Sequence, residues 1–169
     1  MTDAAAAALR YLDRKGAMAR RHSGRNLYDH LVGTSQILRR WQADDAVCLA
    51  GLCHSVYDTH TYRADLDIER QELCEIIGLR AEALAWRFRN IHLFERAAVV
   101  RRPALIHRLS APLQALFLIG AANLVEQSAY LSIRKLGSAP RRYRAILTAF
   151  GPALPQPAAL GMAEELPCP

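Results

Sequence analysis

Residues 46–60 read Ala-Val-Cys-Leu-Ala-Gly-Leu-Cys-His54-Ser-Val-Tyr-Asp-Thr-His60. The part before His54 is apolar on every face of a helix, which is typical of a buried helix rather than a surface one. Its small residues, Ala50 and Gly51, permit close packing against a neighbouring helix. The segment then runs directly into an unusual density of polar side chains. A buried helix that ends in such a cluster predicts a helical core with a polar pocket at the end of that helix.

Helical patterns continue on both sides of this segment. The apolar stripe along 26–41 predicts an amphipathic helix, and Gly78 and Gly137 are typical helix ends. Ser110 and Pro112 mark the start of a long apolar helix. The predicted helices span residues 4–20, 26–41, 46–54, 67–77, 79–91, 110–136 and 141–150. No pair of strands with a hairpin turn is predicted, so we expect an all-α bundle of about six to eight helices.

The length of 169 residues fits one domain with a sizeable core. We assign residues 1–150 to that domain. Residues 151–169 hold five prolines and little periodicity, so we expect an extended or disordered tail. Residues 95–109 carry no clear pattern.

The net charge is +6 and the isoelectric point about 9.5. The arginines are scattered and do not alternate with aromatic residues, so we expect solvated helix faces and no nucleic-acid partner. No apolar stretch is long enough to span a membrane. The four cysteines form no CxxC motif, and no signal peptide is recognisable, so reduced thiols in the cytoplasm are expected. A homodimer through apolar helix faces is an open alternative.

Two histidines are the first candidates for chemistry. His54 ends the apolar segment, and a buried imidazole must be hydrogen-bonded or must coordinate a ligand. His30 lies beside the apolar stripe of 26–41, where it also needs a partner. Tyr57 and Asp58 follow His54 closely. A phenol can donate a proton, and a carboxylate can orient a histidine or act as a base.

The stretch from Arg21 to Thr59 resembles the first half of an HD domain, in particular the hydrolase domain of stringent-response (p)ppGpp enzymes. The resemblance rests on the Arg-His-Ser-Gly start at 21–24, on His30 and on the Ala-Gly-Leu-Cys-His-Ser-Val-Tyr segment that contains His54. This last segment looks closer still to a small bacterial family in which His-Ser replaces His-Asp. The resemblance implies a compact helical domain in which His30 and His54 face one pocket.

Two departures from the HD pattern decide what the resemblance implies about chemistry. Ser55 stands where the family has its first aspartate, and Asn123 stands where it has the last. Serine and asparagine are neutral, weak ligands, and a hydrolytic metal site needs a cation that generates hydroxide. We therefore favour no metal or other cofactor. The alternative is a rearranged divalent-metal site of His30, His54, Asp58 and His60.

The favoured function is an enzyme for a small organic molecule that uses histidine acid–base chemistry, in isomerisation, cyclisation, elimination or hydrolysis. The catalytic candidates are His30, His54, Asp58 and Tyr57. The candidates for substrate binding are Arg21, Thr34, Ser55 and Asn123.

Two other functions stay open. One is a divergent metal-dependent nucleotide phosphohydrolase, for which the resemblance implies that Arg21, Ser23 and Asn26 line the base or ribose site. The other is a non-catalytic module that binds a ligand or a partner chain. The pattern does not assign His92 and His107.

Overall fold

The computed structural model describes residues 2–100 and 110–168, with the side chains of 96–100 left out. The described residues form ten α-helices and one two-stranded sheet, which confirms the all-α class with more helices than expected. The elements are α1 (Asp3–Arg14), β1 (Arg21–His22), β2 (Arg25–Asn26), α2 (Leu27–Arg40), α3 (Asp45–Leu52), α4 (Arg70–Ile77), α5 (Leu79–Phe88), α6 (Ile91–Val100), α7 (Ala111–Ser128), α8 (Ile133–Leu136), α9 (Ala139–Phe150) and α10 (Gln156–Glu165).

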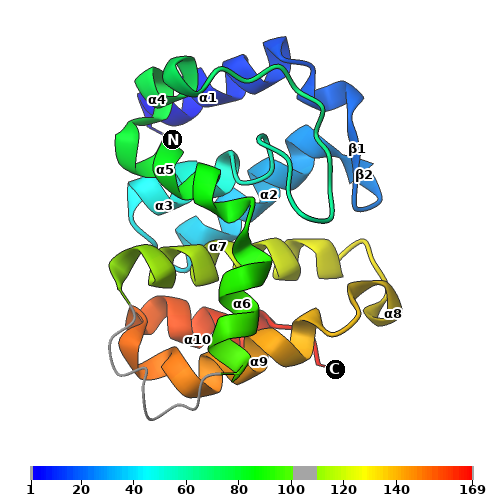
Figure 1. The fold of residues 1–169 in the computed structure, drawn as a ribbon, viewed down its shortest axis with the longest axis vertical. Coiled ribbons are helices and arrows are strands. Elements are labelled where there is room, and N and C mark those ends of the chain that lie inside the picture. The colour runs from blue at the N-terminus through cyan, green and yellow to red at the C-terminus, as the bar shows by residue number, and fades with distance from the viewer. Residues whose placement is uncertain (1, 101–109, 169) are drawn as a thin grey trace.

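Helix α7 lies across the middle of the molecule (Figure 1). It contacts α2, α3 and α5 on one side and α6, α9 and α10 on the other. Ser110 is its N-cap and Pro112 lies in its first turn, as expected. Because α7 is enclosed by two layers of helices, almost every face of it is buried, and any polar side chain on it needs a partner. No helix in the described ranges is long and apolar enough to cross a membrane.

Helices α2 and α3 pack closely and carry the residues that lead to the site. Asn26 and Asp44 cap them, accepting hydrogen bonds from the backbone N–H groups of Asp29 and Val47 at 2.7 and 3.0 Å. A Cβ on Gly51 would lie 2.3 Å from Cδ1 of Leu38, so any larger residue there would force Leu38 to move. Helix α3 ends at Leu52, and His54 therefore lies in the turn that follows the helix.

The expectation of no strand pair is wrong at residues 21–26. Ser23 and Gly24 both have positive φ, +47° and +88°, which a two-residue hairpin turn requires at consecutive positions. This turn pairs Arg21 with Asn26 and His22 with Arg25. The hairpin directs His22 into the molecule, where its side chain is buried.

The expected extended tail is also wrong. Residues 151–153 form a short 3-10 helix and 156–165 form α10. Pro152 and Pro157 lie in the first turns of these elements, where a missing N–H costs nothing, and Pro155 is the N-cap of α10. Glu165 accepts a hydrogen bond from Nε1 of Trp41 at 2.8 Å, and a Cβ on Gly161 would lie 2.1 Å from Cδ1 of that buried tryptophan. Residues 156–165 thus pack on the core instead of extending from it.

Candidate functional site

Two histidines from neighbouring elements meet in the interior. His30 lies on α2 and His54 follows α3, and their Nε2 atoms are 3.2 Å apart. Both side chains are almost completely buried. Nδ1 of His54 donates to the carbonyl of Gly51 at 2.7 Å, which fixes the orientation of the ring. Because α2 and α3 pack closely at Gly51, the two imidazoles are in contact inside the core.

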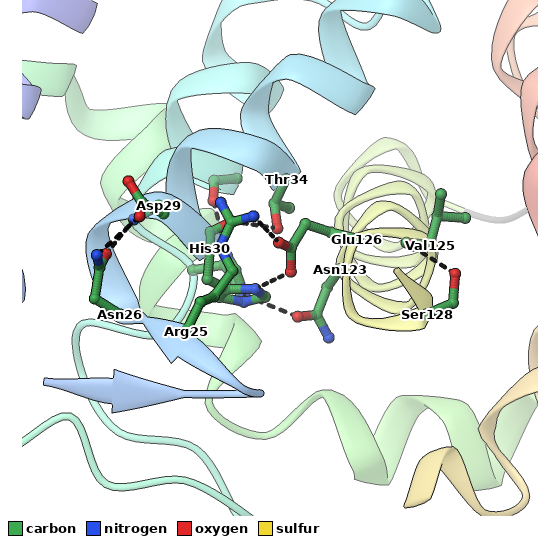
Figure 2. A network of polar contacts seen from close by, with 11 residues as sticks. Arg25, Asn26, Asp29, His30, Thr34, Asn123, Val125, Glu126 and Ser128 are labelled. Atoms are coloured by element: carbon green, nitrogen blue, oxygen red, sulfur yellow. Dashed lines mark hydrogen bonds and ion pairs between the residues drawn. The ribbon is translucent and has the colours of Figure 1, made fainter. Parts of the chain in front are cut away.

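Helix α7 contributes two polar side chains to the same place (Figure 2). Oε2 of Glu126 makes a short contact with Nδ1 of His30, and Oε1 of Glu126 lies 3.2 Å from Nη1 of Arg25. Oδ1 of Asn123 lies 3.2 Å from Nε2 of His54. Asn123 and Glu126 are three positions apart, so they share one face of α7. The result is a continuous buried line of polar contacts from Glu126 through His30 and His54 to Asn123.

Hydrogen-bond roles determine where the protons lie in this line. A carbonyl only accepts, so Nδ1 of His54 carries its proton and Nε2 of a neutral His54 has a lone pair. Nε2 of His30 must then donate to it, which leaves Nδ1 of His30 as an acceptor. The amide of Asn123 must turn its NH₂ group, and not Oδ1, toward Nε2 of His54, because an amide oxygen only accepts. Glu126 must therefore donate to His30, and it can do so only when its carboxyl group is protonated.

The expected pKa values agree with this arrangement. Burial lowers the pKa of His30 and of His54 to about 3 each, and the charge of Arg25 acts in the same direction on His30. Burial raises the pKa of Glu126 to about 7, although Arg25 opposes the rise. The histidines are thus neutral at pH 7, and Glu126 is the member of the line that exchanges its proton near that pH.

His22 adds a third imidazole at the edge of the line. Its ring stacks on that of His30 with centroids 3.9 Å apart, and it contacts Tyr62 edge-on at 4.3 Å. The side chain is more than nine-tenths buried, and Nδ1 has no hydrogen-bond partner in the described residues. Burial lowers the pKa of His22 to about 2, so this ring is also neutral.

A cavity of about 310 Å³ adjoins these groups. His22, Ser55 and Asn123 form one wall, whereas His30 and His54 lie behind it. The opposite wall includes Glu95, Lys135, Arg142 and Tyr143. The volume is at the lower end of the usual range for small-ligand pockets, about 300–1,000 Å³.

The structure does not bring all the expected catalytic residues to this cavity. The hydroxyl of Tyr57 donates to Glu82 at 3.0 Å, inside a separate ion pair with Arg70. Asp58 has a positive φ of +62°, and its carboxylate accepts from the backbone N–H of Ala64 at 2.8 Å. Each of these polar groups already has a local structural partner, which the density of polar residues after His54 did not reveal.

The expected binding residues divide in a similar way. Ser55 and Asn123 line the cavity, but Thr34 donates its hydroxyl to the carbonyl of His30 at 3.1 Å. Arg21 is exposed and lines an adjoining cavity. His60 lies at the cavity edge, stacked on His92 at 4.2 Å, and His107 is outside the described residues.

The alternative metal set of His30, His54, Asp58 and His60 does not come together. In the described part of the chain, no three His, Cys, Asp or Glu side chains form a group suited to a metal ion. His30, His54 and Asn123 bring together two Nε2 atoms and one amide oxygen as possible metal ligands. None of these three ligands is a carboxylate. The residues therefore do not reproduce the two-carboxylate donor set that the HD resemblance implies.

Three residues of the site were not predicted from the sequence. Glu126 could have been found from the sequence, because an acidic residue three positions after Asn123 lies on the same helix face as Asn123. His22 and Arg25 could not, since their positions depend on the hairpin at Ser23 and Gly24. The site is thus larger and more charged than expected.

Part of the chain that carries this site is similar to a known protein family. Residues 11–93 match the model of a family described as a domain of unknown function (DUF6817). No curated protein and no solved structure matched the chain. The matched range includes His22, His30 and His54, whereas Asn123 and Glu126 lie beyond it.

Proposed function

We propose that this protein is an enzyme that acts on a small organic molecule by histidine-centred acid–base chemistry. The observation that carries the proposal is the buried line from Glu126 through His30 and His54 to Asn123, which ends at a cavity of about 310 Å³. Burying four polar side chains costs free energy that an apolar core would avoid. Their placement behind a ligand-sized cavity supports a role in chemistry.

The proposed roles follow from protonation and position. Glu126, with a pKa of about 7, holds and releases the proton near neutral pH, where acid–base catalysis is most effective. A proton from Glu126 enters His30 at Nδ1 while Nε2 of His30 gives its own proton to Nε2 of His54. Because Nδ1 of His54 is bound to the Gly51 carbonyl, the same Nε2 releases that proton to the substrate. Asn123 covers Nε2 of His54 at 3.2 Å, so its side chain must move away before a substrate in the cavity reaches that nitrogen. The ring of His22 lines the cavity and contacts the substrate there.

This machinery suits reactions that move protons and need no electron carrier: isomerisation, cyclisation, elimination or hydrolysis. The HD-superfamily resemblance of residues 21–59 and a bacterial, cytoplasmic setting are part of the proposal. The four free cysteines support the reducing compartment.

The test is an untargeted activity assay in D₂O. The full chain is incubated with a metabolite extract of the source organism, and mass spectrometry follows deuterium uptake and gain or loss of water. We expect time-dependent changes with the wild type and with Arg134→Gln, an exposed control. The His54→Asn variant, checked for helical circular dichroism, should lose them. Identical changes with His54→Asn, or none with the wild type, would contradict the proposal; binding without turnover would favour a ligand-binding module.

The facing Nε2 atoms of His30 and His54, 3.2 Å apart, support a second candidate, the metal-dependent nucleotide phosphohydrolase, although no carboxylate joins them as a ligand. If Glu126 is ionised, Nδ1 of His30 donates to it, and both Nε2 atoms are then free to bind a cation together with Asn123. A metal there would supply a Lewis acid and an activated water. Elemental analysis of protein purified without chelator, with hydrolysis of nucleotides measured before and after dialysis against a chelator, tests this candidate.

A further inference from the structure

We propose that the cavity binds a small organic anion, a carboxylate or a phosphate ester, whose acidic group pairs with Lys135 and Arg142 while its other end reaches His22. The inference rests on the proposed function only in using the same cavity. It concerns the part of the lining that comes from α6, α8 and α9.

The charges on this wall favour an anion. Lys135 and Arg142 line the cavity with a single carboxylate, that of Glu95. Glu95 is already occupied, because Tyr143 donates to one oxygen at 2.5 Å and Nε of Arg142 donates to the other at 3.2 Å. No carboxylate of the described residues pairs with Lys135. Lys135, Arg142 and Glu95 together give the lining one net positive charge.

Arg142 is held in a fixed orientation for such a ligand. Glu95 binds its Nε and Nη2, and Nη1 donates to Ser138 at 2.6 Å. A guanidinium group has five N–H donors, more than these partners use. The arginine is therefore preorganised and keeps N–H groups for the oxygens of an acidic ligand.

His22 supplies an independent observation on the other wall. Its buried Nδ1 has no partner in the described residues although the ring lines the cavity. A buried polar nitrogen without a hydrogen bond costs free energy that a ligand would recover. The cavity is thus lined by two cationic side chains and by the ring of His22, whose buried nitrogen a ligand reaches only if the ring moves.

An adjoining cavity extends the same surface. Both cavities are lined by His22, Thr61, Tyr62, Gln127 and Lys135. The second also contains Arg21, which has no ion pair in the described residues. Arg21 and Lys135 therefore both line the adjoining cavity, and an acidic ligand that enters through it passes these two cationic side chains.

The test uses the full chain and four probes of matched size: benzoate, phenyl phosphate, benzyl alcohol and benzylamine. Titrations followed by ¹H–¹⁵N correlation spectra should show saturable binding of an anion, with shifts at Lys135 and Asn123. Benzyl alcohol and benzylamine should bind much more weakly. The tighter of benzoate and phenyl phosphate identifies the carboxylate or the phosphate ester as the preferred class.

Two variants localise the effect. Lys135→Gln should weaken anion binding about three- to five-fold, as the loss of one exposed ionic contact predicts. Arg134→Gln, its exposed neighbour, should bind as the wild type does. Equal affinity in the two variants, equal binding of benzyl alcohol, or no saturable anion binding would overturn the inference. Binding is read without turnover, so failure of the catalytic proposal leaves this result independent.

Discussion

Nε2 of His30 lies 3.2 Å from Nε2 of His54, and each ring is anchored at its other nitrogen, one by Glu126 and one by the carbonyl of Gly51. Two lone pairs cannot face each other at this distance without repulsion, so one nitrogen carries a proton or both bind a common ligand. The protonation of Glu126 decides between these alternatives. The predictions below test this relationship and the packing that maintains it.

Glu126→Gln should leave stability close to that of the wild type at pH 6. The amide still donates to His30 and accepts from Arg25, as the protonated carboxyl does. Glu126→Leu should cost about 1–3 kcal/mol, because it leaves Nδ1 of His30 buried without a partner. Urea unfolding of the three proteins measures both effects. A large loss in Glu126→Gln would show that the carboxylate form supports the fold.

Stability should rise with pH between about 4.5 and 6.5. His22, His30 and His54 have lowered pKa values of about 2, 3 and 3, so the folded state binds fewer protons than the unfolded state there. Glu126, with its pKa raised to about 7, acts in the opposite direction. The three histidines outweigh the single glutamate, so the free energy of unfolding increases with pH in this range. Each net proton contributes at most about 1.4 kcal/mol per pH unit.

The slope can be assigned by substitution. His22→Gln should reduce it by about one proton, whereas Arg134→Gln, at an exposed position that does not titrate in this range, should leave it unchanged. The measurement is the free energy of urea unfolding at half-unit steps of pH. A slope unaffected by His22→Gln would mean that this histidine is protonated in the folded protein.

Gly120→Ala should destabilise the protein by about 1–3 kcal/mol through overpacking. A Cβ there would lie 1.7 Å from the hydroxyl of Tyr143, which is held by Glu95. Removing that hydroxyl relieves the closest contact, so Gly120→Ala should cost less in a Tyr143→Phe background. A double-mutant cycle in urea tests the coupling. If the free-energy changes of the two substitutions are strictly additive, the strain of Gly120→Ala does not come from the hydroxyl of Tyr143.

Gly161→Ala should likewise destabilise, by about 1–3 kcal/mol, because the new methyl group meets the buried ring of Trp41. Leu160→Ala, at an exposed position of the same helix, should have little effect. Thermal unfolding followed at 222 nm compares them. Equal stability of wild type and Gly161→Ala would indicate that α10 does not pack on Trp41 in solution.

The sequence predicted elements better than contacts between them. Apolar periodicity, the start at Ser110 and Pro112 and the end at Gly78 located the central helices, because these signals depend on neighbouring residues only. The segment after residue 150 was misjudged, since proline content suggested disorder whereas prolines in first turns begin helices. The hairpin was missed because it consists of two residue pairs around Ser23 and Gly24.

The site was predictable in part for the same reason. His30 and His54 stood out by their position in or beside apolar segments, whereas Asn123 was found through the HD resemblance. Tyr57 and Asp58 looked equally suitable, yet their partners Glu82 and Ala64 are separated from them in the sequence, and no local pattern reveals such contacts. The wall formed by Glu95 and Arg142 depends on α6 meeting α9, which the sequence alone did not predict.

The most direct measurement of the central claim is the tautomer of His30 in ¹⁵N-labelled protein at pH 6. Long-range ¹H–¹⁵N spectra distinguish a protonated Nε2 from a protonated Nδ1. The acid–base network predicts a neutral His30 protonated on Nε2, beside a neutral His54 protonated on Nδ1. A His30 protonated on Nδ1, with Nε2 unprotonated, would contradict the network and favour a shared cation between the two rings.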